Sequence, residues 1–254
     1  MAELKQVVDF LGKLIMIDSF PSDSSNNGLQ VEGKANVKKA FFGVDPCVKL
    51  FQKAADENAD FIFLHHGISW KDSLKRLTGY NAKLLDPLFK KGISLYAAHL
   101  PLDANPEIGH NILLAKMLSL KNIGKFAKYA DSEIGFKGNA PKGATLAKFA
   151  EILDSNLGGK SRIFGRPDAM ISRCGIVSGG GGNECLQRAI EDGLDCFVTG
   201  EVGHESFHLI GESGINVIAS GHYCTEKPGV QAVMEKLSRK FKIKCEFIEL
   251  PTGM

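Results

Sequence analysis

Residues 40–66 read AFFGVDPCVKLFQKAADENADFIFLHH, and this stretch decides the architecture of the chain. An apolar run ends in a turn, an amphipathic segment follows with Pro46 near its start, and a second apolar run ends in two adjacent histidines. Short, wholly apolar runs are typical of strands buried on both faces, whereas the segment between them has the spacing of a helix. The stretch therefore predicts a strand–helix–strand unit.

The same alternation runs through most of the chain, which indicates an α/β protein with helices on both faces of its sheets. Strands are predicted near residues 39–45, 59–66, 93–100, 169–182, 194–201, 215–222 and 242–250. Helices are predicted near residues 4–15, 46–58, 81–92, 108–120, 143–159, 183–193, 203–214 and 225–241. Residues 120–140 give no clear pattern.

The chain also resembles itself. Residues 40–66 align without a gap, at an offset of 135, with residues 175–201 of the stretch RCGIVSGGGGNECLQRAIEDGLDCFVTGE (residues 173–201), which pairs Asp60 with Asp195. A second echo joins residues 92–103 to residues 214–226. Such echoes indicate a duplicated unit. We therefore expect duplicated three-layer α/β/α units with mixed sheets in two lobes, one formed by residues 1–125 plus 218–254 and the other by residues 126–217.

Composition excludes several classes of protein. The formal net charge of +2 gives no bulk attraction to nucleic acid or anionic lipid. The six cysteines form no C-x-x-C pair, as is typical of reduced thiols in a cytosolic protein. The first residues lack the features of a signal peptide, and no apolar run approaches the roughly 20 residues that span a bilayer. We expect a cytoplasmic protein without membrane association.

Histidine closes several of the predicted strands. His65 and His66 end one strand, His99 ends another and His222 a third, and an acidic residue follows the last two at a spacing of four, Asp103 and Glu226. In open α/β sheets, ligands bind outside the carboxyl ends of strands. Imidazole and carboxylate suit divalent Zn, Mn, Fe, Co or Ni, and a carboxylate can bridge two ions. The pattern predicts a site for two divalent metal ions.

Each feature also has a simpler explanation. Packing or chance accounts equally well for His65 and His66 alone, and Thr225 could make the segment at His222 an ordinary helix start. The glycines of Gly179–Gly182 fit a tight turn better than a phosphate cradle, which remains an alternative. HESFH (residues 204–208) matches a zinc-protease pattern but lacks a third ligand on a suitable scaffold. His204 could instead border the metal site, and Cys224 is not expected to ligate.

Four stretches carry a family resemblance over nearly the whole chain. DSSNNGLQVEG (23–33), FLHHGISW (63–70), AAHLPLDANPEIGHN (97–111) and VTGEVGHES together with VIASGHYCTEKPGV (198–230) resemble motifs of the Nif three-like dinuclear metal-centre family, whose bacterial members are commonly named GTP cyclohydrolase type 2 homologues. The family motif has proline after the double histidine, where this chain has Gly67. The resemblance implies a toroidal homohexamer with a dimetal site in each subunit.

The resemblance also implies a set of ligands. Glu226 would bridge the two ions, His66 and Asp103 would complete one, and His65 and His222 would complete the other. His99 would lie behind these ligands and orient them. His99 or Tyr223 would donate a proton during catalysis.

The expected function is metal-dependent hydrolysis of a nucleotide or another small molecule that contains phosphate. The resemblance implies ring opening of a nucleotide, as in a GTP cyclohydrolase. The alternative is a non-catalytic metal-binding ring scaffold that binds a protein partner or single-stranded nucleic acid. Nucleic acid would need a local basic face, for which Lys90, Lys91 and Lys121 are candidates, and the near-neutral net charge does not favour it.

Overall fold

The computed structural model describes residues 1–129 and 132–254, which form two compact units. The first contains Met1–Leu102 and Gly229–Leu250, and the second contains Asp103–Pro228 and Pro251–Met254. These boundaries differ from the expected division after residue 125 and before residue 218. The first boundary moves because the helix α5 (His110–Met117) buries Leu114 and Ala115 in the core of the second unit. The second moves because Asn216–Ala219 form a strand of that unit's sheet.

A five-stranded mixed sheet forms the centre of the first unit, in the order β13-β4-β5-β6-β2. The strands are β13 (Lys244–Phe247), β4 (Lys39–Gly43), β5 (Phe61–Leu64), β6 (Ser94–Ala97) and β2 (Gly28–Val31). The first four are parallel, and β2 runs antiparallel to β6. A separate short pair joins β1 (Ala2–Glu3) to β3 (Asn36–Val37). The four parallel strands β13, β4, β5 and β6 are all predicted from the sequence.

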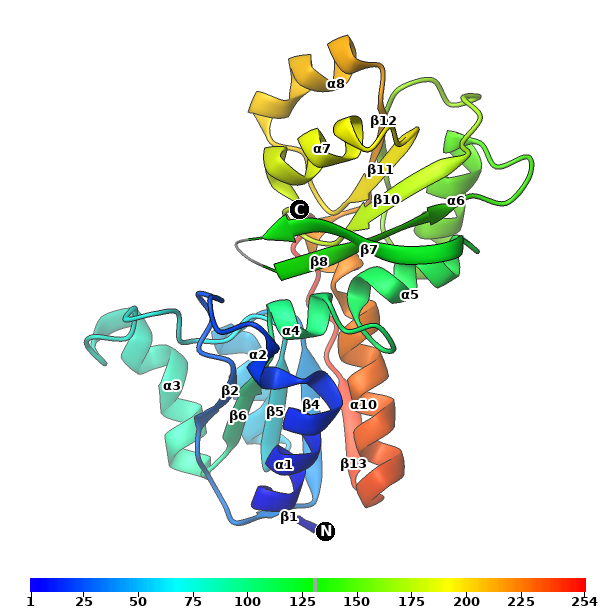
Figure 1. Ribbon diagram of the computed structural model, residues 1–254. Coiled ribbons are helices and arrows are strands. Elements are labelled where there is room, and N and C mark those ends of the chain that lie inside the picture. The colour runs from blue at the N-terminus through cyan, green and yellow to red at the C-terminus, as the bar shows by residue number, and fades with distance from the viewer. Residues whose placement is uncertain (130–131) are drawn as a thin grey trace. The chain divides into compact units, whose positions relative to one another are not determined.

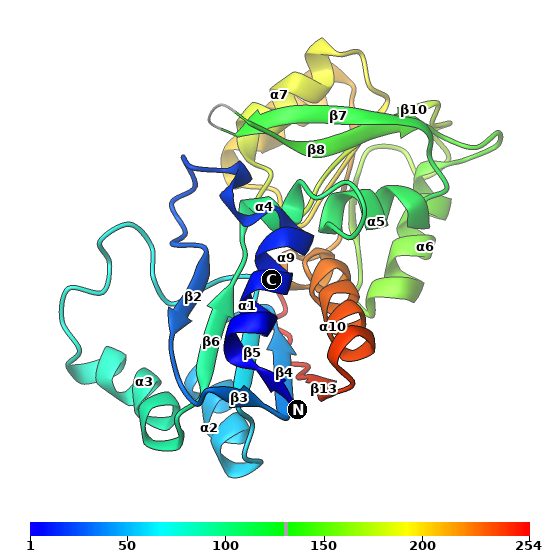
Figure 2. The same cartoon turned by 60° about the horizontal axis from the view of Figure 1, so that its bottom comes forward.

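Helices cover both faces of this sheet (Figures 1 and 2). On one face, α2 (Val48–Asp56) and α3 (Gly79–Lys91) bury their leucines against alternate strand residues such as Ile62. On the other, α1 (Leu4–Ile15) and α10 (Lys227–Phe241) meet through an edge-to-face contact of Phe10 with Phe241, 5.5 Å between ring centres. The one-turn helix η1 (Ile17–Ser19) follows α1. The unit therefore has the expected α/β/α layers.

The second unit has a six-stranded mixed sheet in the order β7-β8-β10-β11-β12-β9. The strands are β7 (Lys121–Tyr129), β8 (Ser132–Asn139), β10 (Arg173–Val177), β11 (Cys196–Thr199), β12 (Asn216–Ala219) and β9 (Arg162–Phe164). Only β10, β11 and β12 are parallel to one another. The helices are α5, α6 (Leu146–Leu157), α7 (Gly182–Glu191), η2 (His204–Ser206) and α8 (Phe207–Ser213), with the one-turn α9 (His222–Thr225) after β12.

The antiparallel strands β7 and β8 lie in the part of the sequence that shows no clear pattern. Most residues of β7 are exposed or half-buried, and Phe126 and Ala127 are its two buried residues. A strand with one face in solvent and several lysines lacks the continuous apolar run that marks the parallel strands. None of the helices in the described parts of the chain is long and apolar enough to cross a lipid bilayer.

The internal duplication is visible in the hydrogen bonds of the two units. Asp60 Oδ2 accepts the backbone N–H of Lys38 at 2.9 Å and of Lys39 at 3.2 Å, at the start of β4. Asp195 Oδ2 accepts in the same way from Ser172 at 2.8 Å and Arg173 at 2.7 Å, at the start of β10. These two aspartates, which the sequence echo pairs, tie neighbouring strand starts together in each unit.

The ladders also refine the sequence alignment. Ala40 pairs with Phe61 in the first unit, and Cys174 pairs with Cys196 in the second. Phe61 and Cys196, in the second strand of each pair, are 135 positions apart in the sequence. Ala40 and Cys174, in the first strand of each pair, are 134 positions apart. The turns before the two helices are equally long, residues 44–47 and 178–181, so the extra residue lies in α7, which has ten residues where α2 has nine.

Replacement of Asp60 by alanine tests this role. The change leaves two backbone N–H groups without their acceptor, so we expect the free energy of unfolding to fall by about 1–3 kcal/mol. The control Asp56→Ala, at an exposed position of α2, should change it by less than about 0.5 kcal/mol. Denaturant titration of both variants measures the difference, and equal stabilities would contradict the role of Asp60.

Candidate metal centre

Three histidines of the first unit gather beyond the carboxyl ends of β5 and β6. His65 and His66 follow β5 directly, and His99 stands between β6 and the one-turn helix α4 (Leu100–Asp103). Their ring centres are 4.6 Å apart for His65 and His66, 5.2 Å for His65 and His99, and 5.6 Å for His66 and His99. Each ring offers one nitrogen within 4.8 Å of the others, so the three could share a metal ion.

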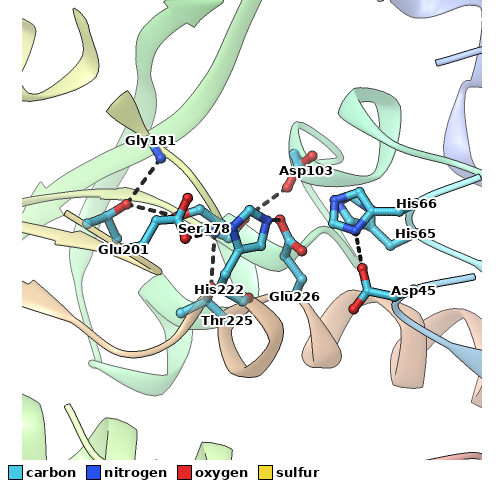
Figure 3. A network of polar contacts seen from close by, with 12 residues as sticks. Asp45, His65, His66, Asp103, Ser178, Gly181, Glu201, His222, Thr225 and Glu226 are labelled. Carbon is cyan, nitrogen blue, oxygen red and sulfur yellow. Dashed lines mark hydrogen bonds and ion pairs between the residues drawn. The ribbon is translucent and has the colours of Figure 1, made fainter. Parts of the chain in front are cut away.

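A fixed acceptor holds the Nδ1 atom of each of these rings. His65 Nδ1 lies 2.9 Å from the carbonyl oxygen of Ala98, which can only accept, so the ring donates from Nδ1. His66 Nδ1 lies 2.7 Å from Asp45 Oδ1, and His99 Nδ1 lies 2.9 Å from Asp23 Oδ1 (Figure 3 shows the first pair). A neutral ring that donates from Nδ1 carries its lone pair on Nε2, the atom that ligates a metal. Metal-binding histidines usually have such a partner behind them.

The N-terminal motif DSSNNGLQVEG supports this cluster. Asp23, whose side chain is 1% exposed, also accepts the backbone N–H of Leu100 at 3.0 Å. Asn27 Oδ1 accepts the backbone N–H of His99 at 2.8 Å. Burial alone would raise the pKa of Asp23, but its hydrogen bonds, first of all to His99, lower that pKa overall. The motif therefore holds the segment that carries His99 in place.

Gln30 of the same motif fixes the loop after the double histidine. Its Oε1 accepts the backbone N–H of Ile68 at 2.8 Å, and its side-chain amide lies where a Cβ on Gly67 would be. Trp70 donates its indole N–H to the carbonyl of Gly67 at 2.9 Å and places its ring edge-on to His99. A larger residue in place of Gly67 would therefore displace the Gln30 side chain from this loop.

The second unit contributes a histidine and two acids. His222, the first residue of α9, lies with Nε2 3.1 Å from Glu226 Oε1, and its Nδ1 lies 3.3 Å from Glu201 Oε2 (Figure 3). Asp103, the last residue of α4, is buried and accepts a hydrogen bond from Ser178 Oγ at 2.8 Å. Glu226 is buried as well, with a side chain only 5% exposed. Asp103 and Glu226 are thus buried acids of the kind that bind cations.

His110 is a further candidate metal ligand, which was not predicted from the sequence. It is fully buried at the start of α5, and it offers a nitrogen within 4.8 Å of a carboxylate oxygen of Asp103. The available signal was its place in the motif AAHLPLDANPEIGHN. Asp45, Asp23 and Glu201 were also not selected, because their contacts to histidines join residues that are 21 or more positions apart in the sequence.

The turn Ser178–Gly182 is a packed turn and not a phosphate cradle. Its amides are used inside the unit: Ser178 N donates to Asn111 Oδ1 at 2.6 Å, Gly179 N to Thr225 Oγ1 at 3.0 Å, and Gly181 N to Thr199 Oγ1 at 3.3 Å. Gly179 has φ +60°, and a Cβ there would collide with Glu226 Oε1. The glycine therefore leaves room for the acid and supports the tight-turn interpretation.

The other histidine, tyrosine and cysteine candidates from the sequence lie at the following positions. His204 lies in η2 and His208 in α8, both exposed, so that HESFH does not lie on one continuous α-helix. Tyr223 is 3% exposed. The sulfur of Cys224 lies beside Gly159, where a Cβ would be 3.0 Å away. His99 directly precedes α4, and His222 is the first residue of α9.

The donor set fits divalent transition metals. Imidazole nitrogens with a fixed lone pair and buried carboxylate oxygens are the ligands that zinc and its neighbours prefer. The residues fit in chemistry, and the tautomers of His65, His66 and His99 are already set by their partners. The first unit by itself thus offers three imidazoles able to share a metal ion, and the second offers the further donors Asp103, His110, His222 and Glu226.

The charge state of His222 without metal follows from its two glutamates. Burial alone would lower its pKa, but the hydrogen bond and charge of Glu226, with Glu201 behind, outweigh burial and raise the pKa from 6.5 to about 9. The metal-free protein therefore holds an imidazolium–carboxylate pair at neutral pH. Because the folded-state pKa is raised, this pair stabilises the fold fully below pH 6.5, and the contribution is lost as the pH rises through about 9.

NMR titration of the metal-free protein tests this charge state. We expect a pKa near 9 for His222, and we expect Glu226→Gln to bring it back towards 6.5 because the main compensating charge is gone. Glu201→Gln should lower it less, since its distance to the ring is longer. A wild-type pKa near 6.5 would show that the pair does not form.

The sequence as a whole matches one protein family and many named relatives. The profile of the Duf34/NIF3 (NGG1p interacting factor 3) family matches residues 2–252. A Pyrococcus abyssi protein named GTP cyclohydrolase 1 type 2 homolog is 39% identical over 255 residues, covering 99% of this chain and 100% of that protein. A Pyrococcus horikoshii protein of the same name is 41% identical over 255 residues, covering 98% of each.

Solved structures agree with this relationship. TTHA1606 from Thermus thermophilus superposes with a TM-score of 0.88 at 36% identity and covers the whole of both chains. Reduced HcgD from Methanocaldococcus jannaschii gives a TM-score of 0.85 at 26% identity, with 98% of each chain covered. The family motifs seen in the sequence, the two α/β units and these matches lead to one conclusion: the chain belongs to the Duf34/NIF3 family.

Proposed function

We propose that the protein binds two divalent metal ions and uses them to hydrolyse a nucleotide or another phosphate-containing small molecule. In this proposal Glu226 would bridge the ions, His66 and Asp103 would complete one site, and His65 and His222 would complete the other. The observation that carries the proposal is the fixed Nδ1 partner of His65 and His66, which presents Nε2 as a ligand before any ion arrives. Membership of a family whose relatives are named GTP cyclohydrolase 1 type 2 homolog supports the reaction class.

Bound ions would supply an activated water molecule and positive charge to balance an anionic transition state. The chain's own residues prepare the site for this. Asp45 orients His66, and Ser178 holds Asp103 by donating to its Oδ1. Gly179 leaves the space that Glu226 occupies. Rigid ligands of this kind bind with less loss of conformational freedom than mobile ones.

Proton transfer to the leaving group is assigned to His99. Its ring is half-buried, its Nδ1 is held by the buried Asp23, and it stands beside His65 and His66. A histidine with an orienting carboxylate can hold and deliver a proton near neutral pH. Tyr223, the other candidate donor, is 3% exposed, which restricts its access to a substrate. The family resemblance supports a homohexameric ring in the cytoplasm as the working form.

Metal analysis of the purified protein tests the ligand set. We expect close to two equivalents of metal per chain in the wild type, and clear losses in His66→Ala from the first unit and Glu226→Gln from the second. Because Glu226 is proposed to bridge both ions, the double variant should lose little more than Glu226→Gln alone.

His208→Ala serves as the matched control, because it removes an exposed histidine of the second unit outside the proposed ligand set. It should keep the wild-type metal content. Unchanged metal content in both His66→Ala and Glu226→Gln, with the fold intact by circular dichroism, would refute the ligand assignment.

Turnover separates the hydrolase from the metal-binding scaffold. The Mn- or Zn-loaded protein should hydrolyse at least one member of a panel of nucleotides and phosphoesters. His66→Ala and Glu226→Gln should reduce that rate by at least about a hundredfold, since each removes a ligand of the ions that activate water. His99→Ala should lower kcat with metal content unchanged.

Equal inactivity of wild type and variants across the panel, at full metal content, would favour the non-catalytic scaffold. In that case a partner protein or single-stranded nucleic acid becomes the next ligand to examine.

A further inference from the structure

We propose that a cavity in the second unit, beside Glu201, is a binding site for the phosphate group of a small molecule, with Lys160 and Arg162 as the groups that hold it. The cavity has a volume of about 420 Å³. It is lined by Lys160, Arg162, Phe164, Glu201, Ser220 and Met254, among others. The inference rests on the proposed function, because it names the part of the substrate that the protein grips away from the metal ligands.

The position of the cavity in the sheet is that of a ligand site. Gly200 and Glu201 follow β11, and Ser220 and Gly221 follow β12, so the cavity opens beyond the carboxyl ends of two adjacent parallel strands. Ligands of α/β proteins collect at such ends. Its volume lies within the range of roughly 300–1,000 Å³ found for small-molecule sites. The cavity is therefore suitable in place and size for a metabolite.

Two cations line this cavity. Lys160 lies two positions before Arg162, the first residue of the edge strand β9, and both side chains are exposed. The Arg162 guanidinium lies 4.7 Å from the centre of the Phe164 ring, which supports it from one face. Within residues 1–129 and 132–254, neither cation forms an ion pair with a carboxylate of the chain.

Two cations that line one cavity without a carboxylate partner suit phosphate better than a neutral group. A phosphate monoester has three terminal oxygens, so it can accept from an ammonium and from a guanidinium together. Charge-assisted hydrogen bonds of this type are stronger than neutral ones. The rest of the lining includes Val202, Pro251 and Met254, which offer apolar surface to the remainder of the ligand. The lining thus combines two cations that can bind an anion with an apolar surface.

Glu201 connects the cavity with a proposed metal ligand. Its carboxylate lines the cavity and lies 3.3 Å from His222 Nδ1 through Oε2. The backbone N–H of His222 donates to the carbonyl oxygen of Met254 at 2.9 Å, so the same cavity wall also holds the start of α9. A molecule bound by Lys160 and Arg162 would therefore contact the residues that position His222.

Binding measurements on full-length protein test the site. The probes are GMP with guanosine, and ribose 5-phosphate with ribose, so that each pair differs only in the phosphate. In isothermal titration of both metal-loaded and metal-free protein, at least one phosphorylated probe should bind at least about tenfold more tightly than its partner, as expected for charge-assisted hydrogen bonds. Lys160→Ala/Arg162→Ala should abolish that difference in both forms of the protein.

The control Lys142→Ala/Arg166→Ala removes the same charge from exposed positions outside the cavity and should retain the preference. Metal content is measured in the same samples, so that loss of the dimetal site and loss of the phosphate site are seen separately. A preference for phosphate that needs metal, or that survives Lys160→Ala/Arg162→Ala, would overturn the proposal. So would the absence of any preference in both pairs of probes.

Discussion

The hydrogen bond on the far nitrogen of each histidine is the constraint on which the proposed chemistry depends. A histidine side chain without a partner has two tautomers and several ring orientations. A metal ion that binds it must select one tautomer and one orientation. Here Ala98 O, Asp45 and Asp23 hold the Nδ1 atoms of His65, His66 and His99, so Nε2 carries the lone pair in a fixed direction. The loss of conformational entropy that orders these side chains occurs when the chain folds. Less entropy is therefore lost when an ion binds.

The repeating parts of the fold could be predicted from the sequence, because they repeat one physical pattern. Parallel strands such as β4, β5 and β11 are buried on both faces and appear as unbroken apolar runs. The hairpin strand β7 could not be predicted in this way, since its lysines face outward and its buried residues are few. The strand β9 has only three residues, too short for any period to show.

The candidate site could also be predicted only in part. The histidines at strand ends were predictable, because the strand-end position follows from the apolar run before each of them. Their hydrogen-bond partners were not predictable, because Asp23 and His99 are 76 residues apart and only the folded chain joins them. The same holds for Gln30, which fixes the loop at Ile68 from 38 positions away. Motif residues that are not candidate ligands therefore hold the candidate ligands in position.

His222 shows how the buried acid that we propose as a metal ligand can be stable in the metal-free protein. Glu226 is almost fully buried, and an isolated buried carboxylate would be costly. The raised pKa of His222 places a proton on the ring at neutral pH, and that charge compensates Glu226. A metal that takes His222 must displace this proton, at a cost of roughly 3 kcal/mol at pH 7 for a pKa near 9. Metal affinity should therefore rise with pH up to about 9, because the competing proton leaves while the carboxylate stays to bind the cation.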